Sequence, residues 1–316
     1  RLPIVGWRLG ALALLWLAGR VAILVSAGLP ALAVAALDLA FPVAFAFAIG
    51  REIVAGRNWR NLVVLVMLSV FALGNAAFHW EAARGDYAAE GYGLRIGLGA
   101  GIMMIGVIGG RIVPSFTRNW LVRRGPGRLP VAPMQRFDKA ALVWLAATLL
   151  LWVALPESRV TGAALVVAGG LHLVRLSRWA GERTLAEPLV TVLHVGYAFV
   201  PLGALALGAA LLAPDTFDRL GAQHLWMGGA IGLMTLAVMT RATLGHTGQA
   251  LAAGPGTVAI YGLLVAAVLA RVAAGLWPDQ AQALYSVSGV AWIAAFASFA
   301  IIYGRLLLRL PAAKRL

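Results

Sequence analysis

The chain has 316 residues, no cysteine and a formal net charge of +14. Hydrophobic residues make up 61% of it and charged residues only 12%, whereas a soluble domain is about one quarter charged. This composition excludes a water-soluble protein, and the lack of cysteine excludes disulfides, thiolate metal sites and cysteine nucleophiles.

Apolar runs of about 20 residues recur along almost the whole chain, separated by short breaks that contain Arg, Gly or Pro. This pattern is typical of a polytopic helical membrane protein. The predicted fold is therefore all-α, a single transmembrane helical domain over residues 1–316. The ten predicted spans cover residues 9–28, 31–50, 61–80, 94–113, 139–155, 160–177, 187–212, 222–241, 257–275 and 285–306. Most of them end at helix-breaking residues, such as Pro30, Pro114, Pro156, Pro214 and Pro278.

The positive charges predict the orientation of the helices. With residue 1 taken as inside, the spans place twenty Lys and Arg residues inside and five outside, which is a strong positive-inside signal. The inside group is Arg1, Arg8, Arg51, Arg57, Arg60, Arg111, Arg118, Arg123, Arg124, Arg128, Arg136, Lys139, Arg175, Arg178, Arg183, Arg241, Arg305, Arg309, Lys314 and Arg315. The basic character is therefore a topology signal, which argues against a nucleic-acid partner. An even number of spans places the C-terminus in the cytoplasm.

Two charged residues lie within predicted spans, Arg20 in the first and Asp38 in the second. A charge at the centre of a membrane helix costs about 2.5 to 3.5 kcal/mol on insertion scales, so such residues normally find a partner. Both lie about eight residues from the same end of their spans, and we expect them to meet. The pair can be a structural ion pair, a proton or ligand station, or a salt bridge to the carboxylate of a cofactor.

The five histidines are the best candidates for metal ligands because no thiolates compete with them. His79 and His224 lie near the outer ends of their spans, while His172, His194 and His246 lie near the inner side. Two such groups that face each other across a bundle can ligate a haem axially. The alternative for each is a hydrogen-bonded or interfacial residue. The methionines could bind Cu(I), although most methionines in an apolar bundle are packing residues.

Glycines are concentrated in the fourth and eighth spans, where they allow close approach of another helix or of a flat cofactor. Each of these spans ends on the inside with an arginine, and the two arginines, Arg111 and Arg241, are 130 residues apart. This spacing is consistent with four-helix repeats.

Three segments resemble those of a known family. They are Gly109-Gly-Arg111-Ile-Val-Pro114-Ser-Phe-Thr-Arg118-Asn-Trp120, then Leu193-His194-Val-Gly196-Tyr197, and then the long block from His224 through Gly228 and Met239-Thr-Arg241 to His246-Thr-Gly248. Together they resemble the NnrS family of bacterial inner-membrane proteins, over nearly the whole chain. The family pattern has two further spans at its amino terminus, about twelve in all, so we expect this chain to lack two helices. Gln249 stands where a basic residue is expected.

The resemblance implies a protein of the bacterial inner membrane that contains haem, b-type, and copper. It also implies a role in nitric oxide metabolism, in protection against nitrosative stress and in denitrification. The implied ligands of haem or copper are His79, His194, His224 and His246, with His172 as a lesser candidate. Arg111 and Arg241 could hold haem propionates, because guanidinium groups match carboxylate geometry. Ordinary anchoring of the inner helix ends is the alternative for both.

Three functions remain open. The first is a redox or gas-binding protein in which a histidine-ligated haem binds or reduces nitric oxide within the lipid bilayer. If it is an enzyme, it is an oxidoreductase of the nitric oxide reductase type, and it needs an electron donor such as a quinol. The second is a secondary transporter, whose polar residues would converge at the midplane. The third is a sensor or assembly subunit that binds haem without turnover.

Overall fold

The computed structural model describes residues 4–214 and 218–308. Within these two ranges every regular element is a helix, and ten helices are long and apolar enough to cross a membrane. The predicted all-α class and the ten spans are therefore confirmed. The chain divides into two compact units, residues 1–104 and 105–316.

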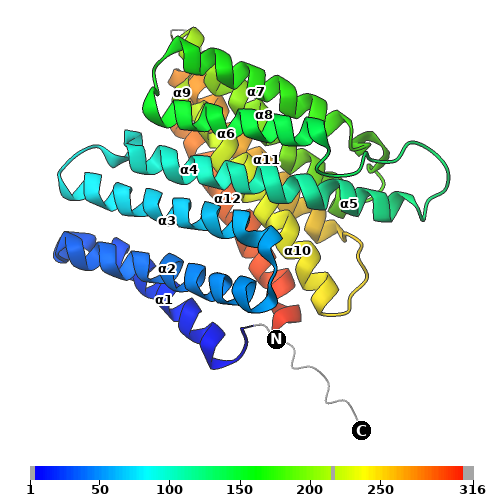
Figure 1. Cartoon of the computed structure of the whole chain (residues 1–316), viewed down its shortest axis with the longest axis horizontal. Coiled ribbons are helices and arrows are strands. Elements are labelled where there is room, and N and C mark those ends of the chain that lie inside the picture. The colour runs from blue at the N-terminus through cyan, green and yellow to red at the C-terminus, as the bar shows by residue number, and fades with distance from the viewer. Residues whose placement is uncertain (1–3, 215–217, 309–316) are drawn as a thin grey trace. The chain divides into compact units, whose positions relative to one another are not determined.

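The first unit is a series of helices joined by short turns (Figure 1). Its elements are α1 (Trp7–Leu24), η1 (Ser26–Gly28), α2 (Ala31–Gly56), η2 (Trp59–Asn61), α3 (Leu62–Ala83), η3 (Ala88–Glu90) and α4 (Tyr92–Met104). Helix α1 packs beside α2, α2 beside α3, and α3 beside α4. Most apolar side chains of α1, α2 and α3 stay exposed, as expected for helices that contact lipid.

Glycines bring α3 and α4 into backbone contact. A Cβ atom at Gly74 would lie 2.6 Å from the backbone nitrogen of Gly97, and a Cβ atom at Gly93 would lie 2.2 Å from that of Phe78. Small residues permit such close crossings in membranes, where dispersion contacts hold helices together. The glycines at this crossing are therefore packing residues.

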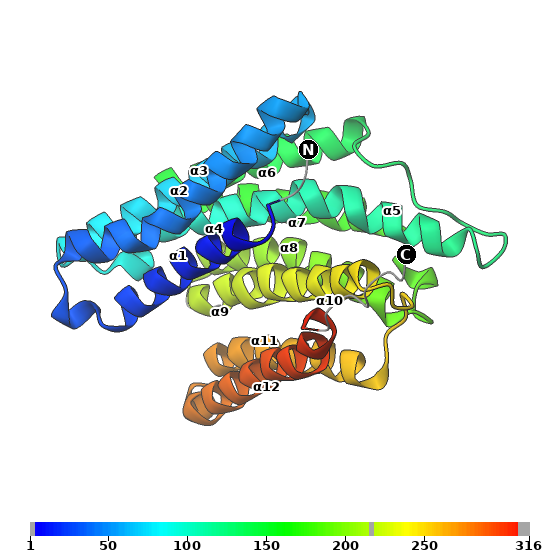
Figure 2. The ribbon, with the colours of Figure 1, turned by 90° about the horizontal axis from the view of Figure 1, so that it is seen from below.

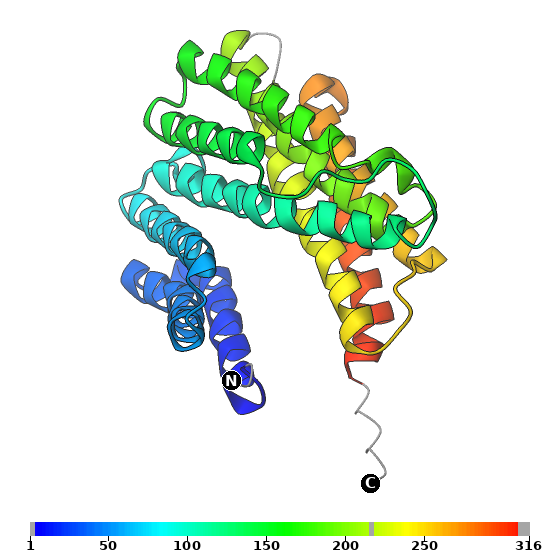
Figure 3. The ribbon, with the colours of Figure 1, turned by 45° about the vertical axis from the view of Figure 1, so that its right-hand side comes forward.

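The second unit is built around α8. Its elements are η4 (Ile105–Gly109), α5 (Gly110–Leu121), α6 (Arg136–Ala154), α7 (Arg159–Ser177), η5 (Gly181–Arg183), α8 (Pro188–Leu212), α9 (Arg219–His224), η6 (Leu225–Leu233), α10 (Met234–His246), α11 (Pro255–Leu276), η7 (Pro278–Gln280) and α12 (Ala281–Leu307). Helix α8 contacts α7, α9, η6 and α10 and buries most of its side chains. Helices α11 and α12 form a hairpin beside η6 and α10 (Figure 3).

Local sequence signals explain where several helices of this unit begin. Ser158 accepts a hydrogen bond from the backbone nitrogen of Val160 at the start of α7, and Asp218 accepts two from the first turn of α9. Helix α8 begins with Pro188 behind a capping Glu187. These caps satisfy backbone N–H groups that have no partner within a helix, so they fix the starting points.

Both glycine-rich spans contain a π-helical segment. Residues Ile105–Gly109 form the first, η4, and Leu225–Leu233 form the second, η6. Figure 2 shows α9, η6 and α10 following one another as one long helix. Each π turn accommodates an extra residue, and such segments are frequent at functional sites.

The predicted end of the fourth span at Pro114 is wrong. Pro114 lies inside α5, which continues to Leu121. Membrane helices tolerate proline when neighbouring groups satisfy the freed backbone atoms, and Ser and Thr hydroxyls commonly help. Pro114 leaves the Gly110 carbonyl without its usual intrahelical donor. The hydroxyls of Ser115 and Thr117 donate to the nearby carbonyls of Arg111 and Val113 and add hydrogen bonds to the same stretch of helix. The other prolines named above lie at helix ends, as predicted.

Two arginines connect the loop between α5 and α6 with the short helix η5: Arg183 of η5 donates to the carbonyls of Pro126 and Arg128, and Arg128 bonds in the other direction. Arg128 donates hydrogen bonds to the Glu182 carboxylate at 2.7 to 3.1 Å and to the Ser177 carbonyl at 3.1 Å. These bonds hold the pKa of the Glu182 carboxyl below its usual value. Because both side chains are more than half exposed, the ion pair is worth at most about 1 kcal/mol.

Not all of the Lys and Arg residues that were assigned to the inside lie in loops. Arg1, Arg309, Lys314 and Arg315 lie outside the described residues. Arg175, which was counted with this group, is completely buried within α7.

We expect Gly74→Ala to destabilise the protein by about 1–3 kcal/mol, because the added methyl group would meet the backbone of α4. Gly97→Ala is the matched control, since a Cβ atom there has nothing within 4 Å. Thermal unfolding in detergent measures both effects. An equal loss in the two variants would contradict the close crossing of α3 and α4.

Candidate functional site

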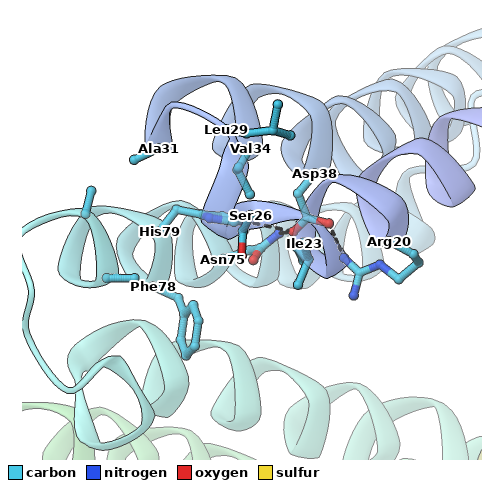
Figure 4. A pocket seen from close by; sticks show the side chains of 12 residues that line it. Arg20, Ile23, Ser26, Leu29, Ala31, Val34, Asp38, Asn75, Phe78 and His79 are labelled. Atoms are coloured by element: carbon cyan, nitrogen blue, oxygen red, sulfur yellow. Dashed lines mark hydrogen bonds and ion pairs between the residues drawn. The ribbon is translucent and has the colours of Figure 1, made fainter.

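The first unit contains a cavity of about 520 Å³ where α1, α2 and α3 meet, with a cluster of polar side chains on one side (Figure 4). Asp38 of α2 is its centre and is almost completely buried. Its carboxylate accepts hydrogen bonds from Arg20 of α1, from Asn75 Nδ2 at 2.8 Å and from His79 Nε2 at 3.1 Å. The predicted meeting of Arg20 and Asp38 is confirmed, while Asn75 is a partner that the sequence analysis missed.

The contact with Asp38 selects the tautomer of a neutral His79 ring. An ionised carboxylate only accepts hydrogen bonds, so in the neutral ring Nε2 carries the proton and Nδ1 presents a lone pair. Nδ1 has no hydrogen-bond partner among the described residues. A carboxylate behind an imidazole orients the ring and strengthens its free nitrogen as a ligand or acceptor. His79 therefore offers one available nitrogen at this cavity.

The core of the second unit contains a buried ion pair. Arg175 Nε donates to Asp138 Oδ1 at 2.9 Å, and Nη1 donates to the Gly106 carbonyl and to the Tyr197 hydroxyl, both at 2.8 Å. A Cβ atom at Gly110 would lie 2.0 Å from Arg175 Nη2, so glycine makes room for the guanidinium. Neither Asp138 nor Tyr197 was predicted as a site residue, and Arg175 was predicted only as an inside charge.

His172 belongs to this buried network. Its Nε2 lies 3.4 Å from the Ala141 carbonyl, and its Nδ1 lies 2.8 Å from the Tyr197 hydroxyl. A carbonyl only accepts, so Nε2 donates to Ala141 and Nδ1 accepts from Tyr197. Both ring nitrogens are occupied, and His172 therefore acts as a structural residue in this conformation.

His194 is also buried, but one of its nitrogens lacks a partner. Its Nε2 lies 2.8 Å from the Thr117 hydroxyl, which itself donates to the Val113 carbonyl. Nε2 is therefore the donor, and Nδ1 has no hydrogen-bond partner within the described ranges. Nδ1 faces Gly181 so closely that a Cβ atom there would lie 2.6 Å away. Helix η5 would have to move before a metal could reach this nitrogen.

The second unit contains its own cavity of about 580 Å³ between η6, α11 and α12. His224, at the end of α9, lines it. The Nδ1 atom of His224 donates to the Leu220 carbonyl at 2.7 Å, one turn earlier in the helix. Nε2 is then the unprotonated nitrogen, with no hydrogen-bond partner in the described part of the chain. The remaining lining residues are Met227, Gly228, Ala267, Val268, Arg271, Tyr285, Ser288, Gly289, Trp292 and Ile293.

The other predicted site residues lie at the ends of α5 and α10. His246 is exposed at the end of α10. Arg241 places its guanidinium carbon 4.3 Å from the centre of the Phe116 ring, and Arg111 is half-buried at the start of α5. Within the described ranges, neither arginine forms an ion pair with a carboxylate. Both are therefore available to an anionic group.

No group of three His, Asp or Glu residues is arranged to hold a metal ion in the parts of the chain that the structure describes. The histidines instead lie in separate environments. His79 and His224 each present one nitrogen at a cavity, and both cavities fall within the usual size range of ligand sites, about 300 to 1,000 Å³.

The fold and the number of spans define a multi-pass helical membrane protein. The sequence matches the family described as NnrS protein over residues 1–310, and the chain belongs to the NnrS family. The resemblance seen in the sequence is thereby confirmed. Comparisons with curated proteins and with solved structures found no match.

We expect Asp138→Ala to destabilise the protein by about 3–5 kcal/mol, because Arg175 would remain buried without its counter-charge. The control is Glu157→Gln, which breaks the exposed ion pair with Arg219 at 2.7 Å and should cost less than about 1 kcal/mol. Unfolding in detergent measures both.

The double variant Asp138→Ala/Arg175→Met removes both charges. Its loss of stability should be smaller than the sum of the two single losses, because neither charge is then left alone. Strict additivity would show that the pair does not act as a unit.

Proposed function

We propose that the protein binds a haem, b-type, in the cavity lined by His224 and acts on nitric oxide in the membrane. The observation that carries the proposal is the His224 ring. Its Nδ1 atom is fixed by the Leu220 carbonyl, and its Nε2 atom is free at a cavity of about 580 Å³. A backbone carbonyl behind one ring nitrogen and a metal at the other is the usual arrangement of histidine ligands.

The rest of this cavity suits a large, flat, mainly apolar group with acidic substituents. Trp292 and Val268 supply apolar surface, and Gly289 leaves open space, since a Cβ atom there would have nothing within 4 Å. The Arg271 guanidinium lies over the Tyr285 ring at 4.2 Å, where its N–H groups can pair with a carboxylate such as a propionate. Bound here, haem would supply an iron centre that binds or reduces nitric oxide.

The membrane setting suits this substrate. Nitric oxide is small, neutral and soluble in lipid, so it can reach a cavity between membrane helices without a polar channel. The lining of that cavity is mainly apolar, and Met227 adds a soft thioether three residues after His224. These residues favour a redox or gas-binding function over transport, for which polar residues should converge at the midplane.

The remaining elements of the proposal rest on the family and on the charge pattern. Copper is proposed as a second cofactor because the chain belongs to the NnrS family. His194 and His246, and the arginines Arg111 and Arg241, stay predictions as cofactor contacts. The excess of positive charges on one side supports a bacterial inner-membrane location with a cytoplasmic C-terminus.

Optical spectra of the purified membrane protein, oxidised and dithionite-reduced, test the proposal. We expect a haem spectrum that changes on anaerobic addition of nitric oxide, and we expect His224→Ala to lose most of it because the axial ligand is gone. Gln223→Ala, the neighbouring residue on α9 that does not line the cavity, should keep the spectrum. Metal analysis of the same sample tests copper.

Two outcomes would overturn the proposal. One is the absence of haem absorbance in properly folded, full-length protein, which would put transport first. The other is an unchanged haem spectrum in His224→Ala, which would place the haem elsewhere. A haem spectrum that nitric oxide does not change would instead support haem binding without gas chemistry and overturn the catalytic part.

A further inference from the structure

The cavity of the first unit lies at one end of its helices. Arg20 and His79 are each four residues before the last residue of α1 and α3, and Asp38 is seven residues after the first residue of α2. At 1.5 Å per residue, these side chains start about 6–11 Å from the helix ends. The cavity therefore lies one to two turns below the surface, where lipid head groups meet the acyl chains.

The polar side of this cavity can accept a hydrogen bond from the hydroxyl group of a ligand. His79 Nε2 donates to Asp38 Oδ2 at 3.1 Å, which leaves Nδ1 as an acceptor that a hydroxyl can reach. A carboxylate–imidazole pair with one free ring nitrogen is the arrangement that accepts a hydrogen bond, and then a proton, from a weakly acidic O–H group. Figure 4 shows Asn75 and His79 of α3 and Arg20 of α1 converging on Asp38 of α2.

Arg20 adds donors to the same cavity. One of its Nη atoms pairs with Asp38, and nearly half of its side chain remains exposed. A guanidinium has five N–H donors in a rigid plane, so others stay available to a carbonyl or phenolic oxygen. The site thus pairs one acceptor with several donors, which allows it to bind both a hydroxyl and a carbonyl form of one ligand.

The non-polar side of the cavity matches a lipid. Ile23, Leu29 and Val34 line it together with Phe78, and the adjacent Leu32 is 82% exposed on the surface of α2. A ligand with a small polar head and a long apolar tail could place the head against Asp38 and lay the tail over this surface. A free polar metabolite would gain nothing from that surface.

We propose that this cavity binds the head group of a membrane quinol or quinone, with one ring oxygen on His79 Nδ1 and with Arg20 donating to the ligand. The inference deepens the proposed function, because it locates the site for the electron donor that a nitric oxide reaction would need. Binding itself rests on residues of the first unit alone. It can therefore be tested whether or not the haem proposal holds.

Binding of decyl-ubiquinone and decyl-ubiquinol to the purified full chain tests the inference, measured by calorimetry in detergent. A short-chain naphthoquinone probe distinguishes the two common quinone types. We expect His79→Phe and Asp38→Asn each to weaken binding of the quinol by roughly fivefold to tenfold, the effect of losing one hydrogen bond. Ser69→Ala, on the same helix as His79 and outside the cavity, is the matched control.

A second measurement uses the unaltered protein, so its result does not depend on whether the variants fold. An azido-quinone that labels the unaltered protein on illumination should modify peptides of α1, α2 or α3, and an excess of decyl-ubiquinol should prevent the labelling. Labelling confined to other segments would overturn the proposal. Equal affinity of His79→Phe, Asp38→Asn and the unaltered protein for the quinol would do the same.

Two further arms separate this inference from the proposed function. In His224→Ala, haem should be lost while quinone binding persists, and quinone binding in a haem-free protein would leave the inference standing. Copper added to the unaltered protein tests a metal at His79 Nδ1 instead. If copper displaces the quinone probe and His79→Phe abolishes copper binding but not quinone binding, the cavity is a metal site and the proposal is wrong.

Discussion

The second unit depends on the burial of one guanidinium group. Arg175 of α7 has no contact with solvent, so only protein groups can pair with its donors. Its Nε and Nη1 atoms have such partners, while Nη2 has none among the described residues. Arg175 binds Asp138 of α6, the Gly106 carbonyl of η4 and the Tyr197 hydroxyl of α8, and it therefore fixes how four elements approach one another. Asp138 also accepts from the backbone nitrogen of Gln135 at the start of α6. The Asp138–Arg175 ion pair thus contributes both to the start of α6 and to the packing of α6, α7, α8 and η4.

The hydrogen bonds of the ring nitrogens also divide the four histidines His79, His172, His194 and His224 into two groups. In His172 both nitrogens are occupied, and in His194 the free nitrogen faces backbone. In His79 and His224 one nitrogen is held by an oxygen of the protein and the other is free at a cavity. When one ring nitrogen is hydrogen-bonded, the ring orientation is fixed and the other nitrogen can bind a ligand. His194 also has one nitrogen held and one without a partner among the described residues, so the feature that distinguishes His79 and His224 is that their second nitrogen lies at a cavity.

Hydropathy was sufficient to predict the helical class and the ten spans, because each span needs a long apolar run. Equal depth in neighbouring spans was sufficient to pair Arg20 with Asp38. The same argument could have paired Asp138 with Arg175, since Asp138 directly precedes the fifth predicted span and Arg175 lies near the inner end of the sixth, but Arg175 was counted with the loop charges. The free nitrogen of each histidine was beyond prediction, because it depends on which carbonyl, hydroxyl or carboxylate lies beside the ring.

The π-helical segment η6 separates His224 from α10. An α-helix turns by about 100° for each residue, and a π turn takes up an additional residue without lengthening the helix by a full turn. The register of α10 is thus offset from that of α9, so the faces that carry Arg241 and His246 are not those that α-helical spacing from His224 would give. The number of residues between His224 and Arg241 or His246 therefore does not show by itself whether they lie on the same face of the helix. Any alignment of its two ends must allow for that shift in phase.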